Sequence, residues 1–492
     1  MFNENEKVFS DDNLRKRLVP TGVEGFDAVL GGGFPKNSLI VLVGCPGSGK
    51  TIFSAQFLYR GCVEYDDNGV YVSFAESKDA FYENMRSFGY DFRKLEDSGK
   101  FRFLDLLTVK EGGIPEVIEL ILREVTELGA KRLVVDPFSA LAQAFKEPHE
   151  VRVFLHTVLS KVCRLQGCTT LIIVENSCMN DKDKVVFGVE GFVADGIIHM
   201  GRSSLMGRPL REITLFKMRG TPLPETRLVF TLKDGFKAFP PFKAKPVDKP
   251  CRFKPQPDTD QFFSSGIPSL DEMLGGGYPR GSPVLIEISE HVSTLQYHLI
   301  AVPTAWNFAT QGRGIIIIPS AGVDHNLIKK RAEEGGLTLD EINSLLRVGI
   351  KEDYPGIKQE PYLVAFKGEN ISEDYKRYME IERELVERTG QPVLRITGVD
   401  MLTDVYGIKE TISILKMDAT WIKENGGLGI ILLKPGYPQL AKTLGAIADI
   451  HLKITREHGT IIVCGVKPRT CFYALEMDTS KGYAMPKLTP II

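Results

Sequence analysis

Short apolar runs alternate with longer segments of mixed polarity along the first half of the chain. Each run has the length of one strand; the runs cover residues 39–43, 70–74, 132–135, 170–174, 196–200 and 213–217. The intervening segments 51–65, 115–128 and 150–166 have the length and the period of helices. Strands that alternate with helices predict βαβ units, and therefore an α/β fold with a mostly parallel, twisted sheet flanked by helices.

One segment of this pattern occurs twice. Residues 21–36 read TGVEGFDAVLGGGFPK, and residues 265–280 read SGIPSLDEMLGGGYPR, at a constant offset of 244 without gaps. A match of this density predicts two copies of one domain in tandem. Six prolines between residues 239 and 262 indicate a semi-extended linker, because proline interrupts helices and central strands. We therefore expect a first domain over 1–238, a linker over 239–262 and a second domain over 263–492.

A glycine-rich loop lies between the first strand and the first helix. Residues 44–51 read GCPGSGKT, which is the pattern of a phosphate-binding loop in the context that this motif requires. Its backbone amides and the start of the helix would surround phosphate oxygens, Lys50 would reach the β- and γ-phosphates, and Thr51 would hold Mg²⁺. The predicted nucleotide-binding residues are Gly44, Cys45, Pro46, Gly47, Ser48, Gly49, Lys50 and Thr51. The cofactors that this motif predicts are ATP and Mg²⁺.

Two carboxylates follow apolar runs that are predicted strands. Residues 131–136 read KRLVVD, so Asp136 is the predicted acidic partner of Thr51 at the magnesium ion. Residues 71–76 read YVSFAE, which places Glu76 at the end of the next strand, where a carboxylate can position the attacking water. An ordinary turn aspartate and an exposed loop glutamate are the alternatives at these positions.

Together these residues resemble the KaiC-like branch of the RecA superfamily. The resemblance rests on residues 21–51, on the VVD strand end, on GVEGFVAD at 188–195 and on KMRGT at 217–221. It implies two RecA-like domains in hexameric rings, with ATP bound between subunits. It further implies that Lys217 and Arg219 reach the γ-phosphate held by a neighbouring subunit. The alternative for these two cations is a solvated basic strand.

One departure from the family pattern concerns hydrolysis. KaiC-like proteins carry paired glutamates after this strand, and here the first of the two positions is Ala75, so that Glu76 matches only the second. This departure predicts slow hydrolysis, or a switch that holds ATP for a long time. The resemblance also makes Glu175, at the end of the run 170–174, a candidate sensor of the nucleotide state, and an ordinary glutamate at a strand end is the alternative.

The second copy lacks the residues of the phosphate site. The offset of 244 aligns the phosphate loop with ISEHVSTL at 288–295, which puts Thr294 and Leu295 in place of Lys50 and Thr51. Thr397 is expected where Asp136 stands, and residues 314–321 contain no glutamate. The spacing Lys467-x-Arg469 is nevertheless retained. We therefore expect a pseudo-ATPase domain that serves assembly or the binding of a protein partner.

Composition narrows the remaining choices. The chain has 492 residues with a formal net charge of −2, which does not favour nucleic acid as a partner. Apolar runs are too short to cross a bilayer and the first residues are polar, so a cytoplasmic protein without a membrane segment is expected. The eight cysteines form no CxxC pair and are expected to be reduced thiols.

The leading hypothesis is a regulatory Mg-ATPase with one active site and one inactive copy of it. The alternatives are a RadA-like DNA recombination or repair ATPase, a P-loop transcriptional regulator, and an autokinase. Neutral charge disfavours the first alternative, and the missing phosphate site of the second copy disfavours the last.

Overall fold

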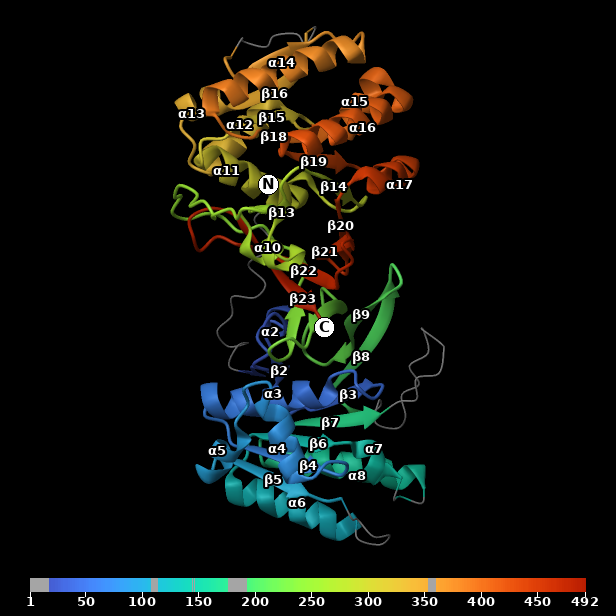
Figure 1. The fold of residues 1–492 in the computed structure, drawn as a ribbon. Coiled ribbons are helices and arrows are strands. Elements are labelled where there is room, and N and C mark those ends of the chain that lie inside the picture. Colours follow the sequence, from blue (N-terminus) through green and yellow to red (C-terminus); the bar gives the residue numbers. More distant parts are fainter. Residues whose placement is uncertain (1–16, 108–113, 144, 146, 176–192, 353–359) are drawn as a thin grey trace. The chain divides into compact units, whose positions relative to one another are not determined.

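The computed structural model describes residues 17–107, 114–143, 145, 147–175, 193–352 and 360–492. The chain divides into two compact units, which comprise residues 1–241 with 491–492 and residues 242–490. In each unit helices flank a large, mixed and mostly parallel sheet (Figure 1).

The first unit contains a nine-stranded sheet in the order β11-β10-β9-β8-β3-β7-β6-β4-β5. The strands from β5 to β8 in this order are parallel, and β9 to β11 continue the sheet antiparallel. Their bounds are β3 Leu39–Gly44, β4 Gly69–Ser73, β5 Phe101–Asp105, β6 Arg132–Asp136, β7 Thr169–Glu175, β8 Gly196–Leu205, β9 Arg208–Met218, β10 Arg227–Thr231 and β11 Lys237–Phe239. A small ribbon pairs β1 Leu18–Val19 with β2 Phe34–Pro35.

Helices cover both faces of this sheet because its central strands are apolar on both sides. The helices are α2 Phe26–Val29, α3 Lys50–Glu64, α4 Lys78–Arg86, α5 Phe92–Asp97, α6 Ile114–Leu128, α7 Phe138–Ala142, α8 Pro148–Thr157 and the π-helical η2 Val158–Leu165. Ile40 and Leu42 of β3 join a hydrophobic cluster with α3, α4 and α5, whereas Val41 and Val43 join another with α6, α7 and α8. The predicted α/β class is confirmed, and the helix predicted over 150–166 is α8 followed by η2.

The second unit repeats the topology of the first. Its order β17-β16-β15-β18-β19-β14-β20-β21-β22-β23 matches the first sheet strand for strand and adds β17 at one edge. The bounds are β14 Ser282–Ile288, β15 Ile315–Ile318, β16 Leu346–Lys351, β17 Leu363–Phe366, β18 Leu394–Gly398, β19 Leu428–Leu433, β20 Ile450–Glu457, β21 Thr460–Lys467, β22 Phe472–Asp478 and β23 Met485–Ile491. A ribbon of β12 Phe262–Phe263 and β13 Tyr278–Pro279 corresponds to the ribbon of the first unit.

Helices also flank the second sheet. They are α10 Pro268–Leu274, α11 Thr294–Thr310, α12 His325–Glu334, α13 Leu339–Leu345, α14 Ile371–Thr389, α15 Val399–Tyr406, α16 Ile408–Asn425 and α17 Pro438–Ile447. Among the described residues, no helix combines the length and the apolar character needed to cross a membrane.

The proline-rich segment before β12 packs against the second unit. Phe253 is buried in the core of that unit, where its ring lies 5.1 Å from that of Tyr483 and 5.7 Å from that of Trp306. The backbone amide of Phe253 also donates to the carbonyl of Gly335 at 2.9 Å. Residues 242–261 contain no helix or strand, but this packing makes them part of the second unit rather than a free tether.

Candidate functional site

The phosphate loop joins the carboxyl end of β3 to the first residue of α3. Gly47 and Gly49 have φ angles of 73° and 99°, which the backbone of residues other than glycine rarely adopts. A Cβ atom at Gly44 would lie 2.3 Å from the carbonyl oxygen of Met200, so the close approach of β8 also requires glycine there. The three glycines therefore fix the turn that starts the helix at Lys50.

Lys50 lies folded against the loop that precedes it. Its Nζ donates to the carbonyl oxygens of Gly44 at 2.8 Å and Cys45 at 2.9 Å, and only 5% of the residue is exposed. Burial lowers the pKa of Lys50, and the charges of Glu175 and Asp136 oppose that shift. An anion at this loop would therefore meet a nearly desolvated cation that is already held within reach.

Thr51 and Asp136 are brought together as predicted. The Thr51 hydroxyl donates to Oδ2 of Asp136 at 2.8 Å, and the Tyr71 hydroxyl donates to the same oxygen. Burial raises the pKa of Asp136, while the hydrogen bonds from Tyr71 and Thr51 lower it. Tyr71, in the middle of a predicted strand, carries no sequence signal for this role; only the register of β4 beside β6 reveals it.

These residues fit a magnesium ion that arrives with a nucleotide. No group of three or more His, Cys, Asp or Glu side chains that could hold a metal occurs among the described residues. One hydroxyl and one carboxylate leave most of an octahedral magnesium shell to phosphate and water oxygens. The Ser48 hydroxyl is buried without a hydrogen-bond partner in the part of the loop that a phosphate would enter. The loop therefore has an unmet donor where the motif expects an anion.

Glu76 lies in the turn after β4 and is half-buried. Asn84 of α4, which sequence reasoning did not single out, donates a hydrogen bond to Oε1 of Glu76. Burial raises the pKa of Glu76, the bond from Asn84 lowers it, and the charge of Asp136 raises it. The neighbouring Ala75 is exposed and offers no functional group.

Lys217 and Arg219 lie at the amino ends of the parallel strands (the amino edge of the sheet), whereas the phosphate loop follows their carboxyl ends (the carboxyl edge). Ile40, near the start of β3, pairs with Gly196, which pairs with Met218. The phosphate loop follows Gly44, four residues further along β3, and four strand residues span about 13 Å. The structure therefore does not bring the two cations to the phosphate loop of their own chain.

The two cations instead contact the segment that precedes β8. Nζ of Lys217 donates to the carbonyl oxygen of Ala194 at 2.7 Å, and Arg219 forms an ion pair with Asp195 at 3.3 Å. Burial lowers the pKa of Lys217, with a further contribution from Arg219. Arg219 is about half exposed, so it is accessible at this edge.

Two arginines that the sequence did not predict lie at the phosphate loop. Arg202 and Arg211 are paired across β8 and β9, and both donate to the carbonyl oxygen of Gly47, at 2.8 and 3.3 Å. Burial lowers the pKa of Arg211, and the charge of Arg202 lowers it further. Arg202 follows the apolar run 196–200 and Arg211 precedes the run 213–217, whereas the hairpin of β8 and β9 extends beyond both runs and includes them.

In the second unit side chains cap the helix that follows the corresponding loop. Ser293 caps α11 in a capping box with Gln296, so side chains rather than an external anion satisfy the first amides of the helix. Register corrects one expectation: Leu394 pairs with Leu428 as Arg132 pairs with Thr169, which puts Gly398, not Thr397, level with Asp136. The predicted alignment of Thr397 with Asp136 is therefore wrong by one residue. The second unit still has no carboxylate at the position of Asp136, because Gly398 stands there.

The lysine at the other edge of the second unit keeps its contact. Nζ of Lys467 donates to the carbonyl oxygen of Ala448 at 2.6 Å, as Lys217 does to Ala194. The lysine–carbonyl contact at the amino edge is therefore common to both units, whereas the residues at the carboxyl edge differ.

Cys45 corrects the expectation of reduced thiols, because it is disulfide-bonded in the structure. The six other described cysteines are free. Of the segment 188–195 that contributes to the family resemblance, residues 188–192 lie outside the described residues.

Comparisons with known proteins agree with this geometry. The model of the KaiC ATPase family matches residues 19–238. The circadian clock oscillator protein KaiC of Synechococcus elongatus is 32% identical over 275 residues, covering 54% of this chain and 51% of that protein. KaiC of Acaryochloris marina is 33% identical over 295 residues, covering 58% and 53%.

The chain spans about half the length of the curated relatives it matches. Among solved structures, a KaiC-like protein of the archaeon Pyrococcus horikoshii is 32% identical, with a TM-score of 0.41, covering 46% of this chain and 99% of that one. By its matched ATPase domain, its relatives and its two mostly parallel sheets, this chain belongs to the KaiC-like proteins of the RecA superfamily.

Proposed function

We propose that the first unit binds Mg-ATP and hydrolyses it slowly, and that the second unit binds no nucleotide and serves assembly or a protein partner. The observation that carries this proposal is the cluster of Lys50, Thr51 and Asp136 at the phosphate loop. The membership of residues 19–238 in the KaiC ATPase family supports it.

Each residue of the cluster has a role that follows from its position. Lys50 leaves the loop carbonyls for the phosphate oxygens, and the unpartnered Ser48 hydroxyl gains an acceptor. Thr51 and Asp136 would hold Mg²⁺, which supplies positive charge to the phosphates when bound. Arg202 and Arg211 lie close enough to the loop to add charge at its rim. Residues 44–51 thus act as the nucleotide site, with no corresponding set in the second unit.

Slow hydrolysis follows from the surroundings of Glu76. A general base that orients water must present a free carboxylate oxygen to it. Here a hydrogen bond from Asn84 occupies one of the two carboxylate oxygens of Glu76. Ala75 cannot take over this role. The proposed enzyme therefore spends a long time with ATP bound.

The placement of Lys217 and Arg219 supports a site completed by a neighbour. Both cations lie at the amino edge of the sheet, about 13 Å from their own phosphate loop by strand register. In a head-to-tail ring the amino edge of one subunit faces the carboxyl edge of the next, and such heterologous contacts close into rings. Lys217 and Arg219 would then supply charge to the transferred phosphoryl group in trans. We propose a homo-oligomeric ring on this basis.

The test compares matched substitutions in the two units by calorimetric titration of the full chain with Mg-ATP. Lys50→Ala is expected to abolish binding, and Thr294→Ala, at the counterpart of Lys50, is expected to leave a single site unchanged. Each variant is checked for an unchanged urea unfolding midpoint. A second site in the wild-type chain, or equal loss of binding from both variants, contradicts the assignment of one site.

A further inference from the structure

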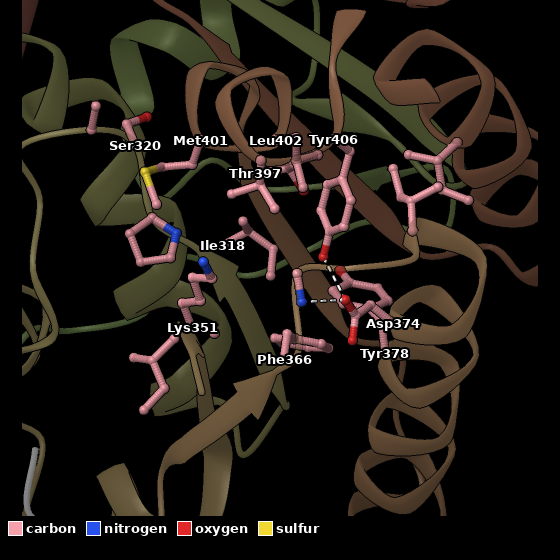
Figure 2. Close-up of a pocket in the computed structure, with 18 of the residues that line it drawn as sticks. Ile318, Ser320, Lys351, Phe366, Asp374, Tyr378, Thr397, Met401, Leu402 and Tyr406 are labelled. Carbon is pink, nitrogen blue, oxygen red and sulfur yellow. Dashed lines mark hydrogen bonds between the residues drawn. The ribbon is translucent and has the colours of Figure 1, made fainter. Parts of the chain in front are cut away.

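The second unit contains a cavity of about 500 Å³. It lies at the carboxyl ends of β15, β16 and β18, beside helices α14, α15 and α16 (Figure 2). Residues 288–295, the counterpart of the phosphate loop, are not among the described residues that line it. In open α/β sheets, ligands bind at the carboxyl ends of strands, and cavities of this volume hold small molecules. The cavity is therefore a candidate site distinct from the lost nucleotide site.

The walls of this cavity are mostly apolar. Ile318, Phe366 and Leu402 contribute side chains from three different elements, β15, β17 and α15. Tyr375 and Tyr378 of α14 also line it, with stacked rings whose centroids are 6.0 Å apart and whose planes differ by 9°. Such walls match a flat ring better than a flexible polar chain, because aromatic faces pack against rings.

Three tyrosine hydroxyls differ in what they bind. Tyr406 donates to Asp374 at 2.7 Å, as Figure 2 shows, and Tyr375 donates to Asp418 at 3.2 Å. The hydroxyl of Tyr378 is buried and has no hydrogen-bond partner. Protein atoms cover this oxygen, so a ligand in the cavity does not reach it.

Thr397 carries a second hydroxyl without a hydrogen-bond partner. It lies at the end of β18 and lines the cavity, and its hydroxyl forms no hydrogen bond with any described residue. Figure 2 labels Thr397 among the lining residues. A hydroxyl both donates and accepts, so Thr397 suits a ligand that carries a hydroxyl of its own.

The charges around the cavity disfavour an anionic ligand. Lys351 lines it with an ammonium group, whereas Asp324 and Asp374 line it with carboxylates, and the carboxylate of Asp374 accepts from the amides of Lys367 at 3.0 Å and Gly368 at 2.8 Å. Asp418, another lining residue, forms an ion pair with Arg395. Two carboxylates against one ammonium group leave no positive excess with which to hold an anion.

We propose that this cavity binds a small uncharged molecule with an apolar ring and a hydroxyl group, held by the aromatic walls and by a hydrogen bond to Thr397. The ligand would bind to the second unit, which is not the unit that carries the proposed phosphate site. The proposal is independent of whether the first unit hydrolyses ATP.

The test uses three para-fluorinated benzenes as probes and the full chain, with binding followed by fluorine NMR line broadening. Para-fluorophenol and para-fluorotoluene are nearly equal in shape and differ by a hydroxyl against a methyl group, and para-fluorobenzoate adds a charge. Wild-type protein is expected to bind the phenol about three- to tenfold more tightly than the toluene, the worth of one net hydrogen bond. Benzoate is expected to bind more weakly than the phenol.

Variants locate the binding. Thr397→Val, which removes the hydroxyl at similar shape, is expected to abolish the preference for the phenol, and Val405→Trp, which fills the cavity, to abolish binding of all three probes. Thr403→Val, in α15 but outside the lining, and Lys50→Ala, in the first unit, are the controls and are expected to change neither result. An unchanged preference in Thr397→Val, unchanged binding in Val405→Trp, or tighter binding of benzoate than of the phenol overturns the proposal. If Val405→Trp does not fold, Thr397→Val decides alone.

Discussion

The sharpest prediction concerns whether one active site is built from two chains. Arg219 is expected to act on the phosphate held by a neighbouring chain, because strand register puts it about 13 Å from its own phosphate loop. The perturbation is a pair of variants, Lys50→Ala and Arg219→Ala, each of which removes one half of the site. Removal of an arginine finger costs about 10³–10⁵ in turnover, so both variants alone are expected to be inactive.

Mixing the two variants restores activity if the site forms in trans. In randomly mixed rings, half of the phosphate loops belong to Arg219→Ala chains, and half of those have a Lys50→Ala chain with an intact arginine as neighbour. The mixture is therefore expected to reach about a quarter of the wild-type turnover, because each heterologous interface is independent. The assay is phosphate release after subunits are mixed and exchanged, with the exposed Arg227→Ala as control.

Two results would refute this reasoning. Turnover in the mixture no higher than in either variant alone, while native mass spectrometry shows mixed rings, would mean that the arginine does not act across the interface. Wild-type turnover in Arg219→Ala alone would mean that it does not act at all. Loss of ring formation in Arg219→Ala would instead identify a structural role in its ion pair with Asp195.

Other predictions concern protonation and buried hydroxyls. Burial raises the pKa of Glu76, so turnover should fall with decreasing pH at values above the ordinary 4.5, and Asn84→Ala should move this fall to higher pH in a pH–rate profile, because it removes a bond that lowers the pKa. Burial lowers the pKa of His298 to about 4, so the unfolded chain binds the extra proton and the second unit should lose about 2 kcal/mol between pH 7.5 and 5. His298→Gln should abolish that loss in urea titrations followed by tryptophan fluorescence, since both tryptophans lie in the second unit. In the same assay at pH 7, Tyr378→Phe should be neutral or stabilising by about 1 kcal/mol, whereas Tyr406→Phe, which breaks the bond to Asp374, should cost about 1–2 kcal/mol.

The loop geometry of the candidate phosphate site was predictable because its residues are local in the chain. Gly47, Gly49 and Lys50 stand within one turn, and the strand before them and the helix after them are legible from polarity alone. Asp136 is distant in sequence, but it ends an apolar strand, which is itself a signal. The parallel arrangement of the strands then brings Asp136 beside Thr51.

Residues whose place at the site depends on how the strands pair could not be predicted in this way. Arg202 and Arg211 reach Gly47 only because the hairpin of β8 and β9 is longer than its apolar runs. The error of one residue at Thr397 has the same origin, since the pairing of β18 with β19, and not the polarity of the residues, sets which position is level with Asp136. The cavity of the second unit combines residues from 318 to 418, and no local pattern marks such a set.

The two units differ most clearly at the carboxyl ends of their strands. Strand order is the same in both, and Lys467 contacts Ala448 at the amino edge as Lys217 contacts Ala194. At the carboxyl edge, Ser293 and Gln296 close the start of α11 with their own side chains, where the first unit leaves the Ser48 hydroxyl unpartnered. A domain that merely decayed would lose buried contacts on both edges alike, because most substitutions destabilise wherever they fall. Retention of the lysine contact at the amino ends and replacement at the carboxyl ends are what we expect if the second unit serves assembly, as proposed, while its strand ends acquired a different cavity.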